Sequence, residues 1–255
     1  YKIMQSMHML RFPVIFASMV TKGCVESGRS VQEGGAKYST AGLYITGAAN
    51  MADSIEAIQK CVFEDKDITM DELIKALDNN FEGEERMRQL LLNKPEKFGN
   101  DKEHVDGIYR EMMHFIADNV QTWPDARGGW FSFNVHSQTV NVSHGAVCGA
   151  TPDGRLAGEP FCDNASPMMG RDKSGPTATG QEAFHDGALF NLRFDPKGVE
   201  GEKGLESIEG VIKTYFDHGG EHIQINVVDT ATLKDAQKHP ENYKGLMVRV
   251  AGYMA

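Results

Sequence analysis

The sequence predicts an α/β fold, because stretches with helical spacing of apolar residues alternate with stretches of twofold alternation. Met51, Ile55, Ile58 and Val62 recur every three or four residues, as on one face of a helix. Residues 131–135 and 223–227 instead alternate apolar and polar side chains, as in strands with two unlike faces. Helix and strand alternating along one chain is typical of the α/β class.

The first half of the chain is predicted to be mainly helical. Residues 3–20 indicate a mostly buried helix broken near Pro13, and the glycine-rich residues 23–47 indicate loop and a short strand. Thr69 and Glu72 form a capping box that opens a helix over residues 70–77. Further helices are expected over residues 84–92 and 105–116, ending before Pro95 and Pro124 respectively.

The second half of the chain contains both helical and twofold spacing of apolar residues. After the strand at 131–135, residues 149–180 are rich in Pro and Gly and are expected to form a long irregular stretch. A helix over 205–215 should stop at Gly219 and Gly220, followed by the strand at 223–227. A short helix over 231–238 and a strand over 246–250 complete the prediction.

Composition excludes several classes of function. The chain has 255 residues, a formal net charge of −10 and 40% hydrophobic residues, as in an ordinary globular protein. The negative charge, without a basic cluster, argues against nucleic acid as a partner. No apolar run approaches the roughly 20 residues that span a bilayer, so no membrane partner is expected. Four scattered cysteines suit a reducing cytoplasm.

The sequence gives no support for a metal or phosphate site. There is no glycine-rich phosphate loop ending in Lys-Ser or Lys-Thr. His218 and His222 are four residues apart, but the intervening glycine pair breaks the helix that would align them as metal ligands. No metal is therefore expected.

The polar faces of the two alternating strands are candidate functional surfaces. They carry Asn134 and His136 on one strand, and His222, Gln224 and Asn226 on the other. In a simple sandwich these side chains would face solvent, whereas in a barrel covered by helices they would line the interior. We favour a hydrogen-bonded barrel lining over direct contact with substrate.

The block Arg249-Val250-Ala251-Gly252-Tyr253 resembles the C-terminal motif of the glycyl radical enzymes, a pyruvate formate-lyase-like family. The resemblance extends in order along nearly the whole chain. The blocks that share it are Glu33-Gly-Gly-Ala-Lys-Tyr38, Gly149-Ala-Thr-Pro-Asp-Gly-Arg155, Ala157-Gly-Glu-Pro160, Ser166-Pro167, Gly170-Arg-Asp172, Gly175-Pro-Thr-Ala178, Gly219-Gly-Glu-His-Ile-Gln-Ile-Asn-Val-Val-Asp229 and Ala236-Gln-Lys-His-Pro-Glu-Asn-Tyr243.

The resemblance implies a fold and a site. The fold would be part of a ten-stranded α/β barrel surrounded by helices. Residues 1–130 would be the mainly helical part of the pyruvate formate-lyase-like domain, and residues 131–255 the C-terminal glycyl radical domain, cut just after its motif. Gly252 would hold the radical, supported by Arg249, Val250, Ala251 and Tyr253. Only glycine lacks a Cβ, and a side chain would crowd the planar centre that shares the unpaired electron with the flanking amides.

The resemblance also implies partners and chemistry. A radical S-adenosylmethionine activating enzyme would install the protein-based radical, with no permanently bound cofactor. The glycyl radical would then generate a thiyl radical on a cysteine that acts on a small-molecule substrate. A homodimer in the cytoplasm is expected.

Cys24 and Glu26 look like the Cys-x-Glu pair of the family's catalytic loop, but their context does not match. Cys24 leads directly into the block at 33–38, which in the family follows a non-catalytic segment, and it lies only 228 residues before Gly252. We expect a buried structural thiol at Cys24 and a catalytic cysteine upstream of Tyr1. Relatives usually also carry a longer segment between Thr179 and Phe190.

Details of the motifs point to one branch of the family. The blocks at 175–178, 222–229 and 249–253 look most like the glycerol/diol dehydratase and choline lyase branch. The expected activity is radical elimination by a dehydratase or a C–N, C–S or C–C lyase. The alternatives are a pyruvate formate-lyase and a non-catalytic radical-bearing spare-part protein. The substrate cannot be read from these residues.

Overall fold

The computed structural model describes residues 2–136, 139–168, 171, 180–184, 187–250 and 253–254. Helices and short parallel strands alternate, which confirms the α/β class. The helices are α1 Lys2–Arg11, α2 Ile15–Val20, α3 Cys24–Ser27, α4 Ala48–Ile58, α5 Met70–Asp78, α6 Glu85–Asn93, α7 Glu103–Gln121, α8 Val140–Ala146, α9 Gly201–Asp217 and α10 Thr230–Lys238. The 3₁₀ and π turns are η1 Val31–Glu33, η2 Gln59–Glu64, η3 Gln181–Ala183, η4 Pro196–Val199 and η5 Pro240–Asn242. The strands are β1 Thr40–Tyr44, β2 Trp130–Asn134, β3 Phe190–Phe194, β4 Ile223–Val227, β5 Arg249–Val250 and β6 Tyr253–Met254.

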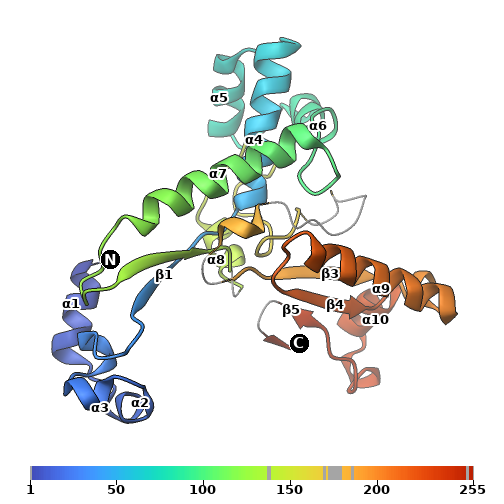
Figure 1. Cartoon of the computed structure of the whole chain (residues 1–255). Helices are drawn as coiled ribbons and strands as arrows, with labels where there is room; N and C mark the ends of the chain where they lie inside the picture. Colours follow the sequence, from blue (N-terminus) through green and yellow to red (C-terminus); the bar gives the residue numbers. More distant parts are fainter. Residues whose placement is uncertain are drawn as a thin grey trace.

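Four of the strands run parallel in the order β1, β2, β3, β4. β1 pairs with β2, and β3 pairs with β4, each over five residues. A parallel bridge between Val135 and Ala188 connects the end of β2 to the start of β3. Figure 1 shows the two pairs meeting near the centre of the molecule, with α7 along the first pair and α9 along the second. The described strands form this open run rather than a closed barrel.

The core lies between the strands and the helices that cover one of their faces. Phe131, Phe133 and Val135 project from that face and pack with buried residues of α4 and α7, among them Tyr109 and Met113. On the second pair, Phe190 packs against Tyr215 of α9, with ring centroids 5.4 Å apart. Because side chains alternate along a strand, the opposite face of the same strands carries the polar residues.

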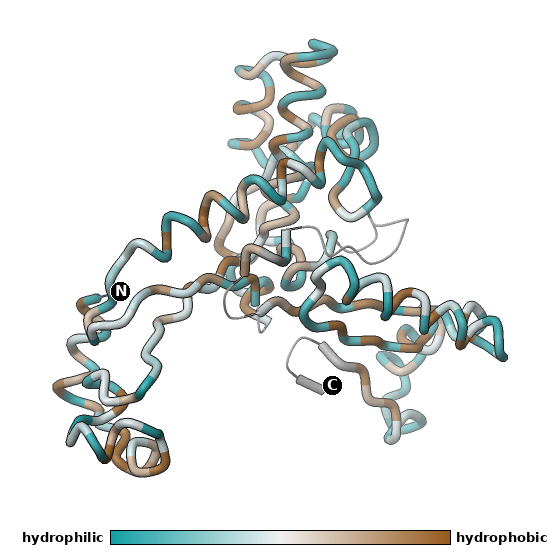
Figure 2. Tube along the Cα trace, viewed as in Figure 1, coloured by the Kyte–Doolittle hydropathy of each residue, from teal (hydrophilic) through white to brown (hydrophobic). Residues whose placement is uncertain are grey.

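The N-terminal helices differ from the prediction. The break at Pro13 is confirmed, since α1 ends at Arg11 and α2 begins at Ile15. Their burial was wrongly predicted: Ile3 is 81% exposed and Phe16 is 79% exposed. Among the described residues their most extensive contacts with other elements are those of α1 with η1 and of α2 with α3, which leave most of their apolar side chains exposed. Figure 2 shows the hydrophobic residues along this segment.

Most other predicted elements are confirmed. The capping box is present, because the Thr69 hydroxyl accepts from the Glu72 N–H and the Glu72 carboxylate accepts from the Thr69 N–H. The strand predicted over 246–250 is shorter, with only Arg249 and Val250 paired. The short helices α3 and α8 were missed, because neither contains a periodic set of apolar residues.

Two further expectations concern the chain as a whole. Within the described part of the chain, no helix is both long enough and apolar enough to cross a membrane. The division predicted between residues 130 and 131 lies at the start of β2 and stays a prediction.

A buried ionic network fixes the irregular stretch after α8 to the helical half. Arg171 Nη1 donates to Asp153 Oδ2 at 2.7 Å and to Asp53 Oδ2 at 3.3 Å. Asn50 of α4 donates its Nδ2 to the same Asp153 oxygen at 2.8 Å and accepts the Cys162 N–H at its Oδ1. Residues more than a hundred positions apart are thereby joined in the interior, and the polar groups of this network are partners for one another.

The Thr-Pro-Asp-Gly-Arg block therefore organises a loop. Arg155 is completely buried, donates to the carbonyls of Gly149, Leu156 and Glu159, and stacks over the Phe161 ring at 4.3 Å. An irregular segment lacks the hydrogen bonds of helix or sheet, and this guanidinium supplies them to its carbonyls.

Burial is the largest cause of the pKa shifts of Asp53 and Lys97 in this network. It raises the pKa of Asp53 to about 6, although the Lys97 charge and the Phe98 N–H act in the opposite direction. It also lowers the pKa of Lys97, whose Nζ donates to the Leu91 carbonyl at 2.8 Å. Both directions follow from the cost of holding a charge away from water.

This shift predicts how stability changes with pH. The folded-state pKa of Asp53 lies above its unfolded value, so its contribution is fully present below about pH 4 and is lost as the pH rises through 6. We expect the free energy of unfolding of the wild type, relative to Asp53→Asn, to fall by about 2 kcal/mol between pH 4 and 7. Urea unfolding of both proteins across this pH range measures the difference in their free energies of unfolding. A difference that does not change with pH would contradict the raised pKa of Asp53.

Candidate functional site

The C-terminal motif forms a short antiparallel hairpin. Arg249 pairs with Met254 and Val250 pairs with Tyr253. Ala251 and Gly252, which connect the two strands, lie outside the described residues. β5 contacts β4, and Figure 1 shows it beside that strand near the centre of the molecule. Residues 249–250 and 253–254 are thus held by a pairing that begins next to the parallel strands.

The predicted polar lining lies on the face of the strands that the helices leave uncovered. Asn134 ends β2, and Gln224 and Asn226 alternate with the apolar residues of β4. Asn134 is 3% exposed and Gln224 is 6% exposed, so neither faces solvent as in a simple sandwich. The Asn134 Oδ1 and Gln224 Oε1 atoms have no hydrogen-bond partner among the described residues. Both oxygens are therefore buried hydrogen-bond acceptors that no described residue supplies with a donor.

The two histidines of this lining lie close to each other. Burial lowers the pKa of His136, and the nearby His222 lowers it further, while the Asp163 carboxylate acts in the opposite direction. The His136 ring also meets the Tyr44 ring edge to face, with centroids 6.3 Å apart. The charges of His222 and Asp163, which lie on two other segments, thus act on the His136 ring, and His222 itself is exposed just before β4.

Hydrogen bonds of Tyr215 and Gln181 fix the turn that carries His222. The Tyr215 hydroxyl donates to Gln181 Oε1 at 2.6 Å and lies 3.1 Å from the His222 carbonyl. The same Gln181 oxygen accepts the Glu221 N–H. Burial raises the pKa of Tyr215 to about 12, so this phenol stays a protonated donor at neutral pH.

Cys24 and Glu26 lie apart from this site. Cys24 is 3% exposed at the start of α3, and Glu26 Oε2 accepts the Gly23 N–H at 2.9 Å as a helix cap. Figure 1 shows α3 at the lower left end of the molecule, away from β5 near the centre. The structure does not bring this pair to the hairpin, and the structural role of Cys24 stays a prediction.

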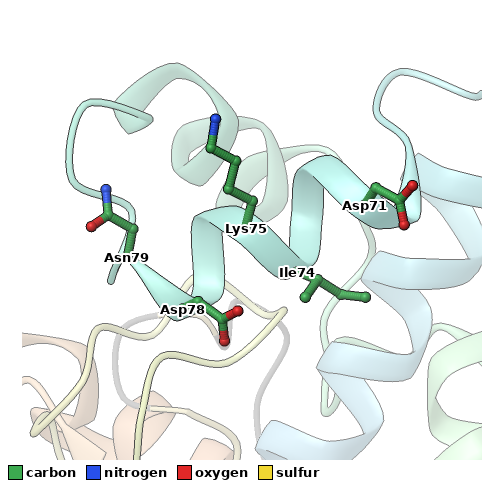
Figure 3. A pocket seen from close by; sticks show the side chains of 5 residues that line it. All are labelled: Asp71, Ile74, Lys75, Asp78 and Asn79. Atoms are coloured by element: carbon green, nitrogen blue, oxygen red, sulfur yellow. The ribbon is translucent and has the colours of Figure 1, made fainter.

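Two other features of the molecule bear on the choice of site. Across the described ranges, no three His, Cys, Asp or Glu side chains converge as metal ligands. A shallow hollow of about 550 Å³ lies along α5, lined by Asp71, Ile74, Lys75, Asp78 and Asn79. Figure 3 shows that Lys75 points away from Ile74 and Asp78, so the charged groups do not meet there.

Two residues of the site were missed by sequence reasoning. Asn191 lies on β3 opposite Gln224, where polar Asn191 and Arg193 alternate with apolar neighbours. This twofold pattern is visible in the sequence and could have revealed the strand. Asp163 lies in the irregular stretch, where no periodicity indicates which side chains turn inward.

Comparison with known families supports the resemblance to the glycyl radical enzymes that the C-terminal motif indicated. The family model described as pyruvate formate lyase-like matches residues 1–145, more than half of the chain. The model described as glycine radical matches residues 161–255, which include the hairpin and β3 and β4.

Individual relatives point to the same family as the two family models. Trans-4-hydroxy-L-proline dehydratase of Clostridioides difficile is 39% identical over 247 residues, which cover 94% of this chain and 31% of the relative. Isethionate sulfite-lyase of Bilophila wadsworthia is 42% identical, over 82% of this chain and 26% of the relative. A Roseburia inulinivorans structure solved for 1,2-propanediol dehydration superposes with a TM-score of 0.91 at 44% identity, covering 98% of this chain and 33% of that one.

The chain thus spans about a third of the length of the relatives it matches. The two family models together account for most of its residues, and the likeness extends to the whole described fold. The chain belongs to the pyruvate formate lyase-like family and carries the glycine radical domain of the glycyl radical enzymes.

Proposed function

We propose that the chain is the radical-storing part of a glycyl radical enzyme that carries out anaerobic radical elimination, as a dehydratase or a C–N, C–S or C–C lyase. The observation that carries this proposal is the glycine radical match over residues 161–255, whose hairpin pairs the residues on both sides of Gly252. Gly252 holds the radical, and Arg249, Val250, Ala251 and Tyr253 form the loop that supports it.

The arrangement of the strands supports the barrel expected for this chemistry. Four parallel strands are covered by helices on one face and carry polar side chains on the other. We propose that they form part of a ten-stranded barrel, with Asn134, His136, His222, Gln224 and Asn226 lining its interior. A closed interior excludes water and side reactions from radical intermediates.

The proposed chemistry consists of hydrogen-atom transfers. The Gly252 Cα radical takes the hydrogen atom of a cysteine S–H, which restores the C–H bond and leaves a thiyl radical. The thiyl radical takes a hydrogen atom from a C–H bond of the substrate, and the substrate radical loses its leaving group. The product radical then recovers the hydrogen atom from the thiol.

Other parts of this proposal lie outside the chain. A radical S-adenosylmethionine activating enzyme removes the Gly252 hydrogen atom, and the thiyl radical forms on a cysteine outside these residues. Cys24, Cys61 and Cys162 are buried here, which agrees with structural roles for them. We further propose a homodimer in the cytoplasm.

The relatives indicate candidate substrates. Their names include trans-4-hydroxy-L-proline, isethionate and 1,2-propanediol, all small molecules that carry a hydroxyl group. The match of residues 1–145 to a pyruvate formate lyase-like model favours an enzyme over a spare-part protein.

Activation of the whole protein that contains this chain should produce a glycyl radical. We expect a doublet in the electron paramagnetic resonance spectrum after treatment with the activating enzyme, because one hydrogen remains on the radical carbon. Gly252→Ala should abolish the doublet, whereas Gly245→Ala, at an uncrowded glycine with ordinary φ, should retain it. A doublet that persists in Gly252→Ala would contradict the assignment.

Oxygen should destroy the activated protein at one position. Oxygen adds to a carbon radical, and the resulting peroxyl group leads to backbone cleavage. We expect air exposure after activation to remove the residues that follow Gly252, as measured by mass spectrometry of the intact chain. The unactivated protein, exposed in parallel, should keep its full mass, and an unchanged mass after activation would count against a radical at this residue.

A further inference from the structure

Asn191 and Gln224 are direct neighbours across the β3–β4 pair. They occupy the same position in the parallel register, so their side chains leave the same face of the two strands. Neighbouring strands lie about 4.8 Å apart, which places the two amide groups side by side. This is the polar face, opposite the one that packs on α9.

Each amide presents a carbonyl oxygen that no described residue supplies with a donor. Asn191 Nδ2 donates to the Asp163 carboxylate, so the orientation of its amide is fixed and Oδ1 is the free acceptor. Gln224 is 6% exposed, and its Oε1 is buried without a partner among the described residues. A buried acceptor without a donor costs about 1–3 kcal/mol, which a bound group with an O–H or N–H would recover.

The surrounding charges favour a donor over an anion. The Asp163 carboxylate lies behind Asn191, and burial together with the nearby His222 lowers the pKa of His136, so that ring is neutral near pH 7. Arg193 shares the face, but it lies one step farther along β3 and its side chain is exposed. Two carbonyl oxygens and a carboxylate would repel a sulfonate or carboxylate group placed against them.

We propose that Asn191 and Gln224 form a binding site for the hydroxyl or ammonium group of the substrate, an inference that rests on the function proposed above. Asp163 is a positioning residue that holds the Asn191 amide with its oxygen turned to the substrate. Gln224 is the second acceptor, fixed by burial between its strand neighbours. The site selects neutral or ammonium-bearing hydroxyl compounds over anionic ones.

The test is a kinetic comparison on the activated whole protein with three probes. 1,2-Propanediol presents only hydroxyl groups. trans-4-Hydroxy-L-proline adds a secondary ammonium group and a carboxylate, which leave it neutral overall, and isethionate adds a sulfonate without a compensating cation. We expect turnover of one of the first two. For that compound, Gln224→Met, which keeps the side-chain length but removes the acceptor, should raise KM about tenfold with little change in kcat.

A matched control is available within the chain. Gln59 in η2 also has a buried Oε1 without a partner among the described residues, but it lies in the helical half. Gln59→Met makes the same chemical change and should leave KM unchanged. All variants should show the glycyl doublet at wild-type intensity, which separates substrate binding from radical storage.

The outcomes distinguish the two proposals. Absence of the doublet in the wild type contradicts the proposed function. With the doublet present, an unchanged KM in Gln224→Met overturns the binding site, as does turnover of isethionate alone or of none of the three probes. A raised KM shared by Gln59→Met would also overturn it, because the effect would then follow loss of any buried amide.

Discussion

The one-sided covering of four parallel strands is the constraint on which the rest of this structure depends. Parallel strands normally bury both faces, and here α4, α7 and α9 cover only one of them. The alternation of side chains then forces the polar residues onto the other face, where the buried Asn134 Oδ1 and Gln224 Oε1 find no donor in the part of the chain that the structure describes. The hairpin around Gly252 begins next to β4, the strand that carries Gln224. The proposed radical-storing hairpin and the proposed substrate-binding site thus lie on neighbouring elements.

The buried ionic network has a supporting role in this arrangement. The stretch between α8 and β3 has little regular structure among its described residues, yet it must deliver Asp163 to the polar face. Arg155 and Arg171 hold it by donating to carbonyl and carboxylate oxygens in the interior. A buried charge is tolerated only with such partners, so the Thr-Pro-Asp-Gly-Arg block is explained by loop geometry as well as by family resemblance.

The sequence predicted those parts of the fold whose signals are local. The period of α4 and α7, the cap at Thr69 and the alternation of β2 and β4 were each readable within a few residues. The pairing of Asp153 with Asn50 was not, because it joins positions 103 residues apart. The apolar residues of α1 and α2 predicted burial, but a sequence does not say which element covers a helix. In the site, Asn191 followed a readable pattern, whereas Asp163 did not.

The central claim is that the unpaired electron resides on the Cα of a glycine in the C-terminal hairpin. The most direct measurement is electron paramagnetic resonance of the activated protein, produced in cells supplied with glycine that is deuterated at Cα. The splitting of the doublet arises from the single hydrogen left on that carbon, and deuterium couples far more weakly. We predict that the doublet collapses to a single line in the deuterated protein. A doublet that remains unchanged would place the radical elsewhere and contradict the account.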